Sequence, residues 1–149
     1  MGATKNSSAV NVRLSSPTLK SVGTTVTPDS GDSVTVSIDE ALATSYGQPA
    51  ANANYTYSLY YSIGDDLSCS TPYETKEVRW GVLPVVTLTA EDIATKIKPT
   101  PQDEQYINFC FEFDIPLSSP FEQTLKESSA VTCFTYESKY TVGYYDETQ

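Results

Sequence analysis

Apolar residues fall on every second position in several short segments of the chain. The segment from Asn54 to Ile63 alternates in this way and stops at Gly64-Asp65-Asp66, and the segment QYINFCFEFDI at 105–115 alternates most regularly. A period of two is typical of a β-strand with one buried face. In 105–115 the pattern predicts a buried face of Ile107, Phe109, Phe111, Phe113 and Ile115, opposite a face of Tyr106, Asn108, Cys110, Glu112 and Asp114.

Weaker strand patterns and one helix pattern fill most of the remaining chain. Segment 89–99, TAEDIATKIKP, changes period: Thr89 is a good N-cap, acids follow in the first turn, lysines lie in the last turn, and Pro99 ends the helix. Residues 40–53 and 64–76 are predicted to be loops. Strands are predicted at 9–16, 21–27, 33–39, 77–82, 83–89, 129–137 and 140–145.

Eight or nine short strands separated by turn signals predict an all-β domain, either a sandwich or a barrel. The 149 residues suffice for one domain with a real core. We expect a single β-sandwich domain over residues 9–145, after a disordered lead-in at 1–8 and before a C-terminal tail at 146–149. The predicted helix lies just before the strongest late strand.

The stretch IKPTPQDEQYINFCFEF at 97–113 resembles the E–F corner of immunoglobulin-like and fibronectin type III domains. There a proline-containing loop leads to a strand-F tyrosine, which would be Tyr106, with its hydroxyl tying the corner. DSGDSVTVSID followed by YTYSLYYSIGDD is similar to the bacterial cell-adhesion-related domain family. The resemblance implies an immunoglobulin-like antiparallel β-sandwich of about seven to nine strands, with the short helix before the penultimate core strand.

Composition removes several classes of function. The net charge is −10, which argues against a nucleic-acid partner, since nucleic-acid binding needs lysine and arginine against phosphate. The chain has no histidine, so serine–histidine and cysteine–histidine nucleophiles and histidine-ligated metals are not available. No segment is apolar and long enough to enter a membrane. Residues 1–10 lack the features of a signal peptide, so we expect a piece of a longer secreted chain or a chain that is never secreted.

The three cysteines leave at least one thiol unpaired within the chain. Cys110 lies on the polar face of its predicted strand, and Cys133 lies on the strand expected beside it. A Cys110–Cys133 disulfide is one prediction, and two unpaired thiols are the alternative.

Carboxylates suggest two further sites. Glu112 and Asp114 share a strand face, about 6.6 to 6.8 Å apart along the strand, as in sugar-cleaving β-sandwiches; the alternative is an ordinary solvated face. In immunoglobulin-like order, several acidic loops would also meet at one end and could bind Ca²⁺ through carboxylate oxygens; the alternative is that loops are acidic because the whole chain is acidic. The expected ligands are Asp29, Asp32, Asp65, Asp66, Asp103 and Glu104.

The leading hypothesis is a non-enzymatic, extracellular β-sandwich module of an adhesin, stalk or surface protein. It would bind a protein or glycan partner, or space neighbouring domains of the same chain. The alternative is a virion structural protein, such as a phage tail or capsid component, and a carboxylate-dependent glycosidase is a distant third. No cofactor is expected other than Ca²⁺.

Overall fold

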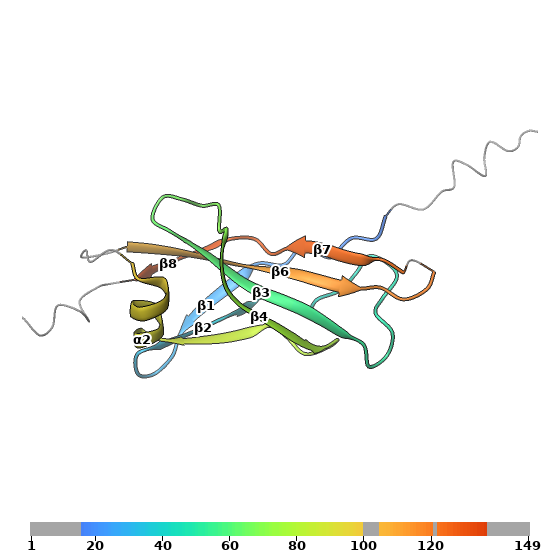
Figure 1. The fold of residues 1–149 in the computed structure, drawn as a ribbon, viewed down its shortest axis with the longest axis horizontal. Coiled ribbons are helices and arrows are strands. Elements are labelled where there is room, and N and C mark those ends of the chain that lie inside the picture. The colour runs from blue at the N-terminus through green and yellow to red at the C-terminus, as the bar shows by residue number, and fades with distance from the viewer. Residues whose placement is uncertain (1–15, 100–104, 121, 137–149) are drawn as a thin grey trace, which may run out of the picture.

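The computed structural model describes residues 16–99, 105–120 and 122–136. The strands predicted at 9–16 and 140–145, and the ends of the predicted domain, lie outside these residues. Within them the chain forms two antiparallel sheets that pack face to face (Figure 1). The elements are β1 (Thr24–Pro28), β2 (Ser33–Ile38), β3 (Asn54–Ile63), β4 (Thr71–Arg79), β5 (Val85–Thr89), α2 (Ala90–Asp92), the π-helical turn η1 (Ile93–Ile97), β6 (Gln105–Pro116), β7 (Thr124–Ser128) and β8 (Thr132–Tyr136).

The strand order is that of an immunoglobulin-like sandwich. One sheet has the order β1-β2-β5, and the other has the order β4-β3-β6-β7, with β8 also pairing with β6. If β1 to β6 are lettered A, B, C, C′, E and F, and β7 with β8 together form G, the sheets are A-B-E and C′-C-F-G. Immunoglobulin-like sandwiches divide these strands between their sheets in the same way. The predicted fold class is therefore confirmed.

The core is built by the alternation seen in the sequence. All five predicted inward residues of β6, from Ile107 to Ile115, are at most 1% exposed. Tyr57 of β3 packs edge-on against Phe111, with ring centroids 5.8 Å apart. From the opposite sheet, Val36 of β2 and Leu88 of β5 are fully buried. These buried residues from both sheets form a continuous apolar layer between them, as in other sandwiches.

The helix pattern is also confirmed. Thr89 caps α2: its hydroxyl accepts the Asp92 N–H at 3.0 Å, and the Asp92 carboxylate accepts the Thr89 N–H at 2.9 Å. This reciprocal capping box satisfies two donors that the helix itself leaves open. Lys98, in the left-handed conformation, ends the helical segment before Pro99.

Two predictions about edge strands were wrong. Residues 71–76 were expected in a loop but form the first part of β4, and β7 was not predicted. Both strands lie at sheet edges and are mostly exposed, so they lack the regular alternation of a half-buried strand. Pro72 is compatible with β4 because an edge strand leaves one side of its backbone unpaired.

A bulge closes the sandwich along one side. Between β7 and β8, Ser129, Ala130 and Val131 face only two residues of β6, so the last strand carries one extra residue. The Ser129 hydroxyl accepts the Phe111 N–H at 2.8 Å and lies 2.7 Å from the Thr24 hydroxyl. The Ala130 N–H donates to the carbonyl of Val22, just before β1. The bulge therefore ties β1 of one sheet to the outer strand of the other.

Candidate binding face

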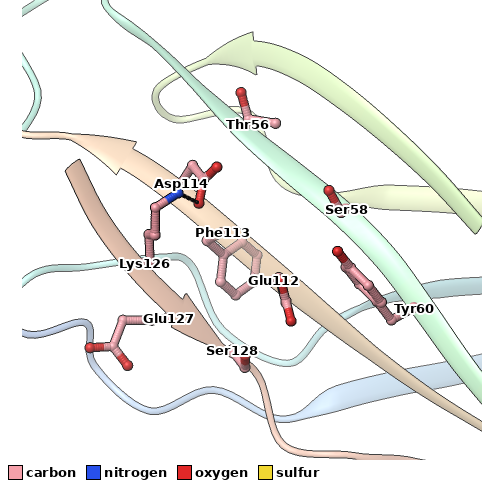
Figure 2. Close-up of a pocket in the computed structure, with 9 residues that line it drawn as sticks. All are labelled: Thr56, Ser58, Tyr60, Glu112, Phe113, Asp114, Lys126, Glu127 and Ser128. Carbon is pink, nitrogen blue, oxygen red and sulfur yellow. Dashed lines mark hydrogen bonds and ion pairs between the residues drawn. The ribbon is translucent and has the colours of Figure 1, made fainter. Parts of the chain in front are cut away.

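A polar hollow of about 390 Å³ lies on the outer face of the five-stranded sheet (Figure 2). Strands β3, β6 and β7 form its floor. The side chains that line it are hydroxyls, carboxylates and one ammonium group, and Phe113 contributes from the core side of β6, where its ring is buried. The polar hollow is defined by Thr56, Ser58, Tyr60, Glu112, Phe113, Asp114, Lys126, Glu127 and Ser128.

Strand register sets the rows of the hollow. Thr56, Asp114 and Lys126 lie opposite one another across β3, β6 and β7. The next row is Ser58, Glu112 and Ser128. Because opposite residues in an antiparallel sheet point to the same face, each row presents its side chains together. Short serine and threonine side chains leave room between the longer ones, and the hollow results.

Charge inside the hollow is partly compensated. The Lys126 ammonium donates to the Asp114 carboxylate at 3.1 Å. The side chains of Tyr60 and Glu112 lie beside each other in the hollow (Figure 2). The negative charge of Glu112 raises the pKa of Tyr60, since it disfavours the phenolate, and burial and a hydrogen bond to Glu112 add to this effect. Among the ionisable groups that line the hollow, Glu112 and Glu127 have no ion pair with a described residue.

This arrangement favours recognition of a ligand rich in hydroxyl groups. Carboxylate oxygens accept hydrogen bonds from hydroxyls, and serine and threonine both donate and accept them. The ring of Tyr60 offers an apolar surface at one end of the hollow. The groups that line the hollow can therefore form hydrogen bonds with the hydroxyl groups of a ligand.

The predicted acidic end forms only in part. The β1–β2 turn with Asp29 and Asp32, and the β3–β4 loop with Asp65 and Asp66, lie at the same end of the long axis (Figure 1). Within the described ranges, however, no three acidic or cysteine side chains lie together in a way that could hold a metal ion. In the described residues Asp29, Asp32, Asp65 and Asp66 therefore do not form such a group, and the calcium site as a whole stays a prediction. Asp103 and Glu104 lie outside the described residues.

Local hydrogen bonds explain why these aspartates stay apart. The Asp29 carboxylate accepts the Thr35 hydroxyl at 2.7 Å and the Ser33 hydroxyl at 3.3 Å, within its own hairpin. Asp66 accepts the Ser68 N–H at 3.0 Å, which lowers the pKa of its carboxyl. The carboxylates of Asp29 and Asp66 thus each order their own turn. The two turns belong to different sheets, so the sheets' separation keeps them apart.

The predicted Cys110–Cys133 disulfide was wrong, because Cys110 is bonded to Cys69. Cys133 is a free, exposed thiol that lies opposite Asn108 rather than Cys110 in the β6–β8 register. The loop between β3 and β4 folds over the outer face of β6 and brings Cys69 onto Cys110, which is 5% exposed. The sequence indicated the outward direction of Cys110 but not the loop that covers it.

Tyr106 lies on the outer face of β6 and is 46% exposed. Its carbonyl accepts the N–H of Gly64 at 2.8 Å, which joins the start of β6 to the end of β3. The loop expected to complete a tyrosine corner, 100–104, falls outside the described residues. The role of its hydroxyl stays a prediction.

Sequence reasoning identified Glu112 and Asp114 on this face but missed their neighbours. Thr56, Ser58 and Tyr60 alternate with the buried residues of β3, so their direction could have been inferred from the same period of two. Lys126 and Ser128 could not, because β7 itself was missed. No local signal states which strands lie beside β6.

A comparison with protein-family models, with curated proteins and with solved structures gives no match. In the described part of the chain, no helix has the length and apolar character needed to span a membrane.

Proposed function

We propose that the protein is a non-enzymatic, extracellular β-sandwich module of an adhesin, stalk or surface protein, and that it binds a glycan in the polar hollow. The observation that carries this proposal is the hollow itself. Its hydroxyl and carboxylate groups stand in register on three neighbouring strands, beside the ring of Tyr60. Rigid strands hold such groups more firmly than loops do, which lowers the entropy cost of binding.

The charge of the chain narrows the class of glycan. With a net charge of −10 and three carboxylates lining the hollow, the site would repel sulfated or sialylated chains. A neutral or amino-substituted sugar would meet acceptors for its hydroxyl or ammonium donors. We therefore propose a neutral or basic glycan as the partner.

The ion pair of Asp114 supports binding rather than hydrolysis. A glycosidase needs one carboxyl group to donate a proton and a second to act as base or nucleophile. Asp114 is paired with Lys126, and its side chain remains 48% exposed on an open face. This environment suits a hydrogen-bond acceptor better than a general acid, which burial away from cations would favour.

The disulfide supports an extracellular location. Disulfides persist mainly in oxidising compartments. The alternative, a virion structural protein, is favoured by the exposed thiol of Cys133, which intracellular assembly would tolerate. Thiol counting under denaturing conditions separates the two: one free thiol supports the secreted module, and three support assembly in a reducing cell.

A glycan array tests the binding proposal. The wild-type protein should bind neutral or amino-substituted glycans, and Tyr60→Ala or Glu112→Gln should weaken binding at least tenfold. Tyr106→Ala and Glu74→Gln are matched controls, because both residues are exposed and lie outside the hollow. The absence of any bound glycan, or equal loss in the controls, would contradict the proposal. Mass spectrometry of the recovered glycan should find it uncleaved.

A further inference from the structure

Strand β5 is an edge strand without charged residues. It pairs with β2 on one side only. The chain from Trp80 to Ala90 contains no charged side chain, although the whole chain carries a net charge of −10. Three exposed apolar residues gather there: Val82, Leu83 and Val85 are 49%, 44% and 48% exposed.

The other sheet edges are protected. β4 carries Glu74, Lys76, Glu77 and Arg79, and β7 carries Lys126 and Glu127. Charged side chains on an edge strand oppose pairing with another chain. β1 and β8 close against each other, since the Thr24 hydroxyl donates to Ala130 O at 2.6 Å and the Thr132 hydroxyl donates to Thr24 O. Among the described edges, β5 alone is both open and uncharged.

The backbone of β5 has hydrogen-bonding groups directed outward. The Ala90 N–H donates to the Asp32 carbonyl. In the β2–β5 register, the backbone N–H and C=O groups of the even-numbered residues of β5 therefore bond to β2. The odd-numbered residues therefore direct their N–H and C=O groups to the open edge. Two of these groups have internal partners: Tyr57 donates to the Val85 carbonyl at 3.3 Å, and Asp92 accepts the Thr89 N–H. Neither backbone group of Thr87 bonds to a described residue.

We propose that β5 pairs antiparallel with β5 of a second copy of this chain, about a two-fold axis at Thr87. Each Thr87 would donate its N–H to the Thr87 carbonyl of the other copy. Val85 would then lie opposite Thr89 of the second copy, and no charged residue would face another within the paired strands. A second copy of this chain fits this edge because its β5 strand is also uncharged. Pairing about a two-fold axis therefore brings no charged side chain against another within the paired strands.

Pairing at β5 leaves the polar hollow open, because the hollow lies on the other sheet. A dimer would present two hollows on one particle. If both engage one surface, avidity follows without any new contact to the ligand.

Sedimentation of the full chain from low micromolar to near-millimolar concentration tests the pairing. The wild-type protein should form a dimer as concentration rises. Val85→Lys places a charge at the pairing edge, and Thr87→Pro removes an N–H that β2 does not use, so each should raise the dimer dissociation constant at least tenfold. Val131→Lys is the matched control, because Val131 is also exposed (42%) but lies away from β5.

A wild-type protein that stays monomeric at every concentration overturns the proposal, as does a Val85→Lys variant that still forms the dimer. Equal loss in Val131→Lys would mean that charge alone, and not the β5 edge, controls association. Circular dichroism of each variant checks that it is folded. If Thr87→Pro fails to fold, Val85→Lys alone decides.

Discussion

At the scale of single residues, Asn108 joins the core sheet to the loop that covers it. Its side chain is fully buried, and its amide donates to the carbonyls of Gly64 at 3.2 Å and Asp66 at 3.0 Å. Its oxygen accepts the thiol of Cys133. A buried polar group of this kind is stabilising only while its partners are present. The sequence predicted a polar outward face here and not a buried amide, because nothing local indicates that a loop folds over β6.

Asn108→Ala should lower the free energy of unfolding by about 2 to 4 kcal/mol, since it removes the donor to the Gly64 carbonyl, leaves the Asp66 carbonyl with the Ser62 hydroxyl alone, and removes buried contacts. Urea unfolding measures this change. Asn54→Ala is the matched control: Asn54 is exposed and bonds only weakly to Glu77, at 3.2 Å. Its effect should stay within about 0.5 kcal/mol. Similar effects for the two variants would show that the Asn108 network does not hold the loop.

At the scale of elements, the sequence predicted what local patterns encode. β2, β3 and β6 were recognised because one face of each is buried and apolar, and α2 was recognised by its cap. β7 and the start of β4 were missed because edge strands are held by backbone pairing rather than by an apolar face. The rows of the polar hollow depend on register between distant strands, which no short window of sequence contains.

The capping box of α2 gives a prediction about pH. The Thr89 N–H is the largest cause of the lowered pKa of Asp92. A carboxyl whose folded pKa is lowered stabilises the protein above its unfolded pKa, near 3.9, and loses that effect as pH falls through the folded pKa. Asp92→Asn should therefore be less stable than wild type at neutral pH, and the difference should shrink below about pH 4.

Thr89→Ala is the control for this pH effect. It should cost about 1 kcal/mol at both pH values, because a hydroxyl does not titrate in this range. Thermal melts at neutral and acid pH compare the three proteins. A constant difference between Asp92→Asn and wild type at both pH values would contradict the assigned role of the carboxylate.

At the scale of the whole molecule, the Cys69–Cys110 disulfide links the β3–β4 loop to the strand at the centre of the five-stranded sheet. It spans 41 positions of sequence, so it restricts a long loop of the unfolded chain. The joint variant Cys69→Ser/Cys110→Ser should lower the free energy of unfolding by about 4 kcal/mol on the chain-entropy estimate. Cys133→Ser should change it by less than about 1 kcal/mol. Urea melts that rank the variants in the reverse order would contradict this pairing.

Whether the polar hollow binds a glycan is tested by titrating isotope-labelled protein with neutral and amino-substituted glycans. The backbone amide chemical shifts are followed during the titration. If the polar hollow is the binding site, the largest shifts fall on Thr56, Ser58, Glu112 and Ser128, and the three-stranded sheet is unaffected. The same titration of Tyr60→Ala should give much smaller shifts. Shifts centred on β1, β2 or β5, or none at saturating glycan, would contradict the account.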